Sequence, residues 1–265
     1  LARALTANDN PLTARVMVNR VWAAHFGRGL VRTTSNFGEL GSRPSHPQLL
    51  DHLATRFVAE GWSLKQLHRD IMLSATYQQA STYREGQARI DGDNQWLWRM
   101  NRRRLEIESW RDSMLFVSGE LDEKVGGPSL QLSDQKNRRR TLYGFVSRHR
   151  LDELLRLFDF PDPNITSASR VVTTVPLQQL FVLNSEFMAQ RARALAGRIE
   201  KEASQDEDGR IEHAFQLLYQ RPPSESDLEL AREFLQAAAA DNGKLSPWQQ
   251  YAMVLLAANE FMYVD

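Results

Sequence analysis

Apolar residues recur at helical spacing along most of the chain. The clearest case lies in residues 8–27, where four side chains occupy positions i, i+3, i+4 and i+7 of one helical face, namely Val18, Val21, Trp22 and His25. Asn10 can cap the start of this helix, and Pro11 suits its first turn, where no backbone N–H is needed. Gly27 suits its end, because glycine readily adopts the left-handed conformation found there. The pattern predicts a helix that begins at Pro11 and ends before Gly27.

Similar start and stop signals predict further helices. Three pairs have the spacing of a capping box, namely Ser45–Gln48, Ser63–Gln66 and Ser246–Gln249. The expected helical segments after the first are 45–62, 63–81, 105–118, 151–158, 177–199, 210–219, 224–240 and 246–261. Within the long segment 177–199, Asn184-Ser185 marks a kink or a break. Helices should therefore make up most of the fold.

Two short segments differ from this pattern. Residues 126–132 (GGPSLQL) and 139–147 (RRTLYGFVS) favour extended structure and are separated by polar and basic residues. They predict a small hairpin or an irregular insert near residues 128–147. We therefore expect a mainly α protein, an irregular multi-helix bundle with a small β-hairpin insert.

An acidic, polar stretch at residues 200–209 interrupts the helical pattern and predicts a loop or linker. On this basis residues 1–199 form the main helical domain, which carries the β insert. Residues 210–265 form a C-terminal three-helix segment that packs on the main domain. No repeat of fixed period is visible in the sequence.

The composition is that of an ordinary globular protein, with 42% hydrophobic and 25% charged residues. Cysteine is absent, which excludes disulfides, thiolate zinc sites and covalent c-type haem attachment within this chain. The longest apolar runs are far shorter than the roughly 20 residues that a bilayer span requires. Because the chain begins at Leu1, without a methionine or an apolar leader, we expect a piece of a longer or processed protein.

Positive and negative charges balance at 33 each, but they are unevenly distributed. Residues 200–241 hold eleven acidic residues against four basic ones, so residues 1–199 carry a net positive charge. Of the 33 cationic residues, 28 are arginine, whose planar guanidinium pairs with two oxygens at once. This bias suits internal ion pairs and anion binding alike. The balanced total and the absence of a recognisable nucleic-acid module disfavour DNA or RNA as a partner.

The stretch MNRRRLEIESWRD (100–112) places three arginines directly before an acidic helix start. Carboxylates in a first helical turn are stabilised by the helix dipole, and residues three or four apart can pair. The favoured interpretation is a structural ion-pair network, and a ligand-facing role is the alternative. The network would consist of Arg102, Arg103, Arg104, Glu106, Glu108, Arg111 and Asp112.

A second basic run, DQKNRRRTLYGFVSRHR (134–150), is the stronger candidate for an anion site. Aromatic residues alternate with its cations, an arrangement that suits sugar stacking or nucleic-acid contact. The alternative is a solvated loop. The expected anion-binding residues are Arg138, Arg139, Arg140, Arg148 and Arg150.

The segment FDFPDPNITSASR (158–170) allows three interpretations. Its two prolines and its Asp, Asn and Ser side chains are typical of a rigid turn. Its oxygens could also bind calcium, although the spacing matches no EF-hand loop, or a carboxylate pair could act in acid–base chemistry. If a catalytic cleft exists around residues 148–170, its candidate residues are Asp159, Asp162, His149 and Arg170.

The six histidines show no metal-ligand spacing, and no metal site is expected. His25 lies on an apolar helix face beside Trp22 and is interpreted as a core histidine with a hydrogen-bond partner. The sequence contains neither a G-x-S-x-G elbow nor a phosphate-binding loop.

Six stretches together resemble one family. They occur in the order NPLTARVMVNRVWAAHFGRGLV, NFGELGSRPSHPQLLDHLATRFVAEGWSLKQLHRDIMLSATYQQAS, MNRRRLEIESWRD, LLRLFDFPDPN, TTVPLQQLFVLNSEFM and ANEFMYVD. This order is similar to that of the planctomycete domain-of-unknown-function family 1553, the C-terminal part of large secreted proteins. The resemblance covers nearly the whole chain, from about Asn10 to Asp265.

The resemblance implies a context and no activity. Such proteins usually carry a c-type cytochrome domain upstream, so the resemblance implies export to the periplasm or beyond and haem c in another domain. Members often have a cysteine near the segment NITSASR, where this chain has Ser167 and Ser169. A metal or redox role that needs that cysteine is therefore not supported here.

Three functions follow from these observations as hypotheses. The favoured one is a helical module that binds an anionic ligand, such as an acidic polysaccharide, or docks to its partner domains. The first alternative is part of an enzyme, a hydrolase or an oxidoreductase, with a cleft around residues 148–170. The second is nucleic-acid binding, which the charge balance disfavours.

Overall fold

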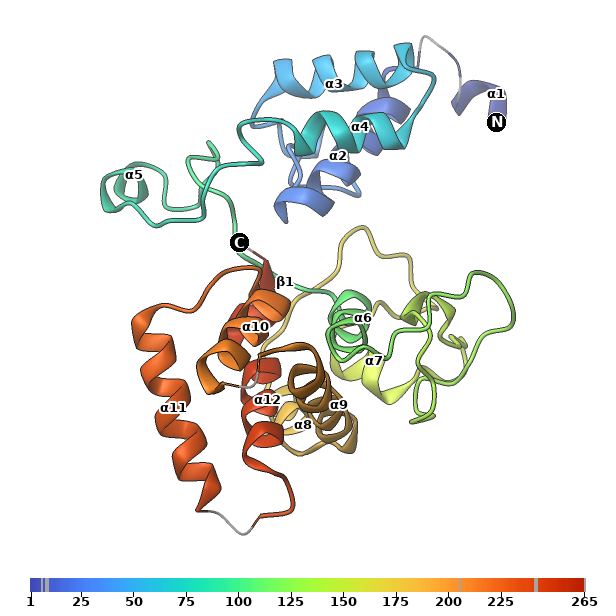
Figure 1. Ribbon diagram of the computed structural model, residues 1–265. Coiled ribbons are helices and arrows are strands. Elements are labelled where there is room, and N and C mark those ends of the chain that lie inside the picture. Colours follow the sequence, from blue (N-terminus) through green and yellow to red (C-terminus); the bar gives the residue numbers. More distant parts are fainter. Residues whose placement is uncertain (6, 8–9, 205, 241–242, 265) are drawn as a thin grey trace. The chain divides into compact units, whose positions relative to one another are not determined.

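The computed structural model describes residues 1–5, 7, 10–204, 206–240 and 243–264. The chain forms two compact units, Leu1–Arg103 and Arg104–Val264 (Figure 1). Helices dominate both units, so the mainly α class predicted from the sequence is confirmed. The division that the sequence predicted, with a linker at residues 200–209, is a different one and stays a prediction.

The helices of the first unit are α1 (Ala2–Leu5), α2 (Pro11–Phe26), α3 (Pro47–Ala59), α4 (Leu64–Met72) and α5 (Glu85–Ile90). Helices α2, α3 and α4 pack against one another and enclose a core (Figure 1). The core side chains come from one face of each helix, among them Val18, Phe26, Leu50, Phe57, Leu67 and Ile71.

The start and end of α2 follow the sequence signals. The Asn10 side chain accepts a hydrogen bond from the Leu12 N–H at 2.9 Å, and Pro11 occupies the first turn. Gly27 has φ +76° and donates its N–H to the carbonyl of Ala23, which ends the helix. Ser63 likewise caps α4 by accepting from the Gln66 N–H.

The capping box predicted for Ser45 and Gln48 is wrong. Helix α3 begins at Pro47 after His46, and no side chain caps it. Because Pro47 takes the first helical position, Ser45 lies one residue too early to serve as the cap. Its hydroxyl instead donates to the carbonyl of Leu30 at 3.3 Å.

The helices of the second unit begin after the short strand β1 (Arg103–Arg104), which marks the boundary. They are α6 (Ile107–Val117), the 3-10 turn η1 (Thr141–Tyr143), α7 (Glu153–Leu157), α8 (Pro176–Asn184), α9 (Glu186–Glu202), α10 (Glu207–Tyr219), α11 (Glu225–Ala239), α12 (Pro247–Ala257) and α13 (Asn259–Met262). The predicted break at Asn184-Ser185 is confirmed, since Ser185 is extended and caps α9.

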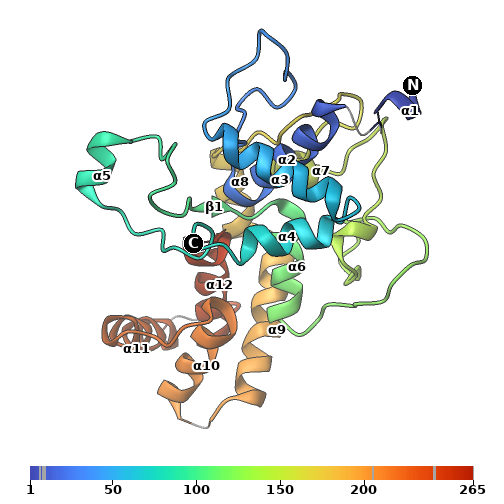
Figure 2. The same ribbon diagram turned by 90° about the horizontal axis from the view of Figure 1, so that it is seen from above.

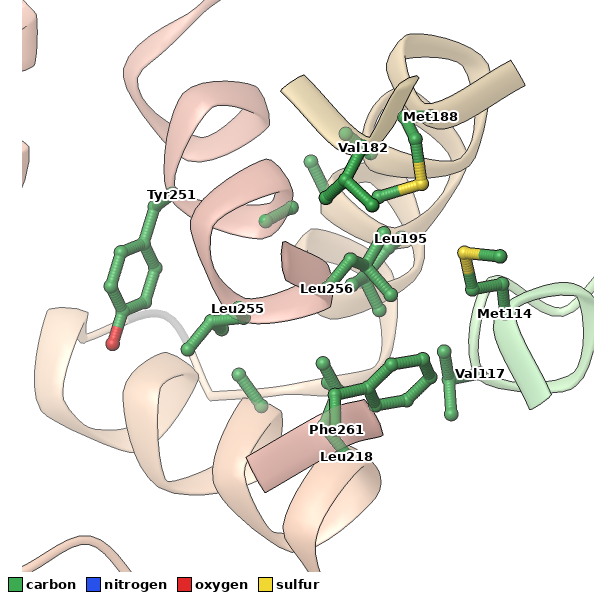
Figure 3. Close-up of a cluster of buried hydrophobic side chains, with 14 of the residues drawn as sticks. Met114, Val117, Val182, Met188, Leu195, Leu218, Tyr251, Leu255, Leu256 and Phe261 are labelled. Carbon is green, nitrogen blue, oxygen red and sulfur yellow. The ribbon is translucent and has the colours of Figure 1, made fainter. Parts of the chain in front are cut away.

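The core of the second unit lies around α9 and α12, which pack closely together, with α6 beside α9 (Figures 1 and 2). Buried side chains from these helices and from α8, α10 and α13 meet there (Figure 3). The predicted single helix at 246–261 is in fact two, because Ala258 has ψ 146° and breaks it. The break lets Phe261 of α13 enter the core.

The small sheet does not lie where the sequence placed its β insert. Strand β1 pairs with β2 (Tyr263–Val264), which follows α13. Within residues 128–147 the only described pairing is an isolated bridge between Leu130 and Gly144, with a second bridge from Asp122 to Arg139 beside it. Both bridges are parallel, whereas the strands of a hairpin are antiparallel, so these extended residues do not form a hairpin.

The acidic stretch lies mostly at helix ends. Helix α9 runs to Glu202, and α10 begins at Glu207 after Asp206, whose carboxylate accepts the Gly209 N–H at 2.7 Å. Asp206, Glu207 and Asp208, at the start of α10, are stabilised by the partial positive charge of the helix N-terminus. Residue 205 lies outside the described residues. No helix within the described ranges has the length and the apolar character needed to cross a bilayer.

A core substitution tests this packing. Leu195 of α9 is 0% exposed, so Leu195→Ala is expected to lower the free energy of unfolding by about 2–5 kcal/mol through lost burial and a residual cavity. Leu230→Ala in α11, where the side chain is 62% exposed, should change it by less than about 0.5 kcal/mol. Urea unfolding followed by circular dichroism measures both, and equal midpoints for the two variants would contradict the assigned core.

Candidate functional site

The arginine triplet is divided between the two units. In the first unit, Arg102 donates to the hydroxyl of Ser81 at 3.3 Å, and Arg103 donates to the carbonyl of Ala24. In the second unit, Arg104 is nearly buried, with 8% of its side chain exposed. Each of the three thus has a side-chain hydrogen bond to a residue of its own unit.

Arg104 and Asp159 form the centre of a polar cluster. The two side chains are 2.7 Å apart, from Nη2 to Oδ2. Arg104 also donates to the carbonyl of Thr173 at 2.6 Å and to the side-chain oxygen of Gln178 at 3.0 Å. Gln178 in turn donates to the carbonyl of Leu157 at 2.9 Å. We call Arg104, Asp159, Thr173 and Gln178 the Asp159 cluster.

Asp159 is held on both of its oxygens. Thr173 donates to it twice, from its hydroxyl at 2.6 Å and from its backbone N–H at 2.9 Å. Burial alone would raise the pKa of Asp159, but the hydrogen bonds from Thr173 and Arg104 outweigh burial and hold the pKa below its ordinary value. Asp159 itself, two residues after the end of α7, has a positive φ of +63°. These hydrogen bonds tie the turn after α7 to Arg104 and to Thr173, which precedes α8.

Arg170 is paired with the start of α6. It donates to both oxygens of Glu108 at 2.7 Å each, and Glu106 lies 3.4 Å away. Its guanidinium carbon lies 5.2 Å from the centre of the Phe160 ring. Burial opposes ionisation of Glu108, yet the hydrogen bonds from Arg170 lower the pKa of Glu108. This bidentate pair ties the 158–170 segment to α6.

Arg111 is almost completely buried, and its main partners are uncharged. It donates to the carbonyls of Asn137 and Arg139 at 2.8 and 3.0 Å, whereas the nearest carboxylate oxygen, of Asp112, is 3.9 Å away. Burial lowers the pKa of Arg111 to about 10. Asp112 accepts the N–H and the hydroxyl of Thr141 at 2.7 Å each. Together these residues fix residues 137–141 against α6.

The basic run 134–150 is also engaged in part. Arg138 pairs with Glu120 at 2.9 Å, and Arg139 donates to the carbonyls of Lys124, Gly126 and Pro128. Arg140 lies 3.9 Å from Asp112, while Arg148 and Arg150 are exposed. The carboxylates that the run lacks in sequence are thus supplied by distant residues. Anion binding by these arginines stays a prediction.

The four catalytic candidates are not joined by any described contact. Asp159 is bound within the Asp159 cluster, and Arg170 is paired with Glu108. Asp162 is exposed and accepts the Asn164 N–H at 2.8 Å, as in an Asx turn. His149 is exposed as well. The turn interpretation of residues 158–170 describes this geometry.

His25 has a histidine partner. Its Nε2 lies 2.7 Å from Nδ1 of His68, and its ring meets the edge of Tyr77. Burial lowers the pKa of His25, and His68 and Arg103 lower it further. No group of three or more metal-ligating side chains occurs in the described part of the chain.

Three arginines that sequence reasoning missed line a pocket of about 250 Å³ in the first unit. Its floor includes Trp22 and Phe26, whose rings stack with their centres 4.2 Å apart. Its rim carries Arg28, Arg32 and Arg43. We call this the arginine pocket.

The loop that carries these arginines is fixed from below. The side-chain amide of Asn19, which is 0% exposed, donates to the carbonyl of Val31 at 3.0 Å and accepts its N–H at 2.8 Å. Gly29 lies against Asn19, and a Cβ there would approach the amide to within 2.6 Å. A buried two-point clamp and a glycine therefore hold the backbone between Arg28 and Arg32.

The charge around the arginine pocket is incompletely balanced. Asp93 lies 3.2 Å from Arg32 and 4.0 Å from Arg28, and its side chain is 70% exposed. Exposed pairs of this kind contribute only about 0–1 kcal/mol. Arg43 forms no ion pair with any residue that the structure describes. One signal in the sequence was available, three arginines and a single acid, Glu39, between Gly27 and His46.

The comparisons with known proteins show a family. The family model described as PSD1, protein of unknown function (DUF1553), matches residues 1–235. The chain therefore belongs to this family, as its six ordered motifs indicated. No curated protein and no solved structure matches the chain.

The Asp159 cluster can be tested by substitution. Asp159→Asn keeps the shape and the tolerance of positive φ, but it removes the charge that Arg104 and Thr173 bind. The free energy of unfolding at pH 7 should fall by about 1.5–3 kcal/mol, the usual range for hydrogen bonds to a charged group. Asp162→Asn is the control, because Asp162 is exposed and bonds within its own turn.

The same variant should change the pH dependence of stability. Because folding lowers the pKa of Asp159 below 3.8, its stabilising contribution is complete above that value and is lost as the pH falls through the folded pKa. The stability difference between the native chain and Asp159→Asn should therefore shrink below pH 3.8 in urea unfolding series. A difference in the free energy of unfolding that stays constant down to pH 2.5 would contradict a stabilising role of the ionised Asp159.

Proposed function

We propose that this member of the PSD1 family is a binding module whose arginine pocket takes the acid group of an anionic ligand, an acidic polysaccharide being the ligand class. The observation that carries the proposal is the convergence of Arg28, Arg32 and Arg43 on one hollow. Guanidinium groups bind carboxylate and sulfate oxygens through two parallel hydrogen bonds.

The weak internal pairing of these arginines supports the proposal. About half of the Arg28 and Arg32 side chains is exposed, and both face the same carboxylate, that of Asp93. An oxyanion in the pocket would replace solvent around three cations, for which Asp93 is the one acidic competitor among the described residues. The buried Arg111 of the second unit differs, because it already donates to the backbone carbonyls of Asn137 and Arg139.

The size and floor of the pocket limit the ligand. A volume of about 250 Å³ accepts one charged group with part of a sugar ring rather than a long segment. Trp22 and Phe26 are only 5% and 1% exposed, so they close the hollow from below and the ligand would be held mainly by the arginines. Nucleic-acid binding has less support, because it requires a stripe of cations along the phosphate backbone.

The proposal includes the context that the family resemblance implies. The module would belong to a larger exported protein, in the periplasm or beyond, whose other domains include one with haem c. Its support is the order of the six motifs that carry the family resemblance. Docking of the arginine pocket to an acidic surface of such a domain is the competing use of the same chemistry.

Affinity electrophoresis tests the pocket. Gels containing dextran sulfate, polygalacturonate, neutral dextran or DNA are run at 50 and 300 mM salt with the 265-residue chain. Retardation by one or both acidic polysaccharides is expected, and it should weaken with salt because binding displaces counterions. A variant with Arg28, Arg32 and Arg43 all changed to Gln should lose at least about 1.4 kcal/mol of binding, a tenfold change.

A matched triple variant identifies the site. Arg140, Arg148 and Arg150, which are exposed members of the predicted basic run, are changed to Gln in the control. Retention of binding in the control supports the arginine pocket. Loss of binding only in the control would assign the anion site to the basic run instead, and no retardation by either acidic polysaccharide would refute an acidic-glycan ligand.

A further inference from the structure

A second, larger cavity lies in the second unit. Of the arginines proposed or predicted to bind anions, only Arg150 lines this cavity. Its volume is about 650 Å³, within the range of small-molecule sites. One side is apolar and is formed by Leu132, Phe145, Leu154, Phe181 and Phe187. We call it the phenylalanine pocket.

The break between α8 and α9 builds this apolar side. Because Ser185 is extended, Phe181 from the end of α8 and Phe187 from the start of α9 both reach the cavity. Phe181 is held by an edge contact with the buried Phe158, their centres 5.6 Å apart. The two rings are therefore supplied by rigid helices rather than by loops.

The third ring is positioned by a close backbone approach. Phe145 donates its backbone N–H to the carbonyl of Leu130 at 2.8 Å, and Leu130 donates its own N–H to the carbonyl of Tyr143 at 2.9 Å. A Cβ on Gly144 would lie 2.9 Å from the Leu132 side chain, so only glycine lets the two segments meet here. Phe145 itself is 40% exposed, which leaves part of its ring for a ligand.

The rim of the phenylalanine pocket offers donors and acceptors together. Arg150 and Glu153 have no hydrogen bond or ion pair with a described residue, and both line the cavity. Gln135 accepts a hydrogen bond from Gln190 at 2.9 Å, so its amide N–H groups remain as donors. Glu186 adds a carboxylate that is shared with Arg193, 3.0 Å away.

These features select among ligand classes. A hydrocarbon would leave Arg150 and Glu153 without partners as they lose water, which is costly. An anion would face three carboxylates, those of Asp152, Glu153 and Glu186, against one arginine. A sugar ring without acid groups has apolar C–H faces for the phenyl rings and hydroxyls that both donate and accept.

We propose that the phenylalanine pocket binds a neutral saccharide unit. The site is independent of the arginine pocket, since it lies in the other unit and would hold uncharged hydroxyls through stacking and hydrogen bonds, whereas the arginine pocket would hold an acid group through charge pairing. One chain would then carry two kinds of carbohydrate contact. A failure of acidic-glycan binding at the arginine pocket would therefore leave this proposal untouched, and the reverse holds as well.

The test is electrophoresis of the 265-residue chain through gels that contain β-glucan, xylan, mannan or galactan, each in turn. At least one should retard the chain, and raising the salt from 50 to 300 mM should leave the retardation unchanged. Phe145→Ala should weaken it at least tenfold. Phe116→Ala is the matched control, because Phe116 is also exposed, at 54%, and does not line the cavity.

Two further variants separate the alternatives. Glu153→Gln keeps hydrogen-bonding capacity, so it should weaken neutral-sugar binding by no more than about threefold, whereas a cationic ligand would require the charge. The Arg28, Arg32 and Arg43 triple variant should bind neutral polysaccharide normally. The proposal is overturned if none of the four polysaccharides retards the chain, or if Phe145→Ala and Phe116→Ala behave alike while both keep the native melting temperature.

Discussion

The second unit depends on finding hydrogen-bond donors for backbone carbonyls that lie outside helices and strands. Residues 119–140 contain no described helix, so their buried carbonyls need donors from elsewhere. Arg111 from α6 and Arg139 from the segment itself supply them. Arg191 of α9 adds a buried ion pair with Glu120 at 2.7 Å. Since an arginine offers five N–H groups in one plane, a few such residues replace the ladder of a missing sheet.

This use of arginine explains why the richest basic stretches are not the most open ones. Arg138 and Arg139 carry positive charge in the sequence, but in the fold they serve Glu120 and a loop of carbonyls. Arg28 and Arg32 are less conspicuous in the sequence, yet among the described residues their only acidic partner is the exposed Asp93. Availability for a ligand therefore follows from what each guanidinium has already bound, rather than from the density of charge.

The two pockets differ in the physics that they offer. The arginine pocket combines unbalanced charge with a small volume, and the phenylalanine pocket combines three rings with neutral and mixed polar groups. Both rest on rigid supports, the Asn19 clamp in one unit and the break at Ser185 in the other. The Asp159 cluster and the Arg170 pair hold the remaining turn in place.

Local signals in the sequence predicted most of the helices, because caps such as Asn10 and Ser246 and apolar periodicity act within a few residues. They were wrong for the cap of α3 and for the ends of the helices expected at 63–81 and 246–261. The family was likewise readable from six ordered motifs. The small sheet, the partners of the basic run and both pockets were not, because each joins segments far apart in the chain, as Glu120 and Arg138 or Phe145 and Phe187 illustrate. Periodicity shows which face of a helix is buried, whereas only the tertiary structure decided which charges are neutralised and which stay open to a ligand.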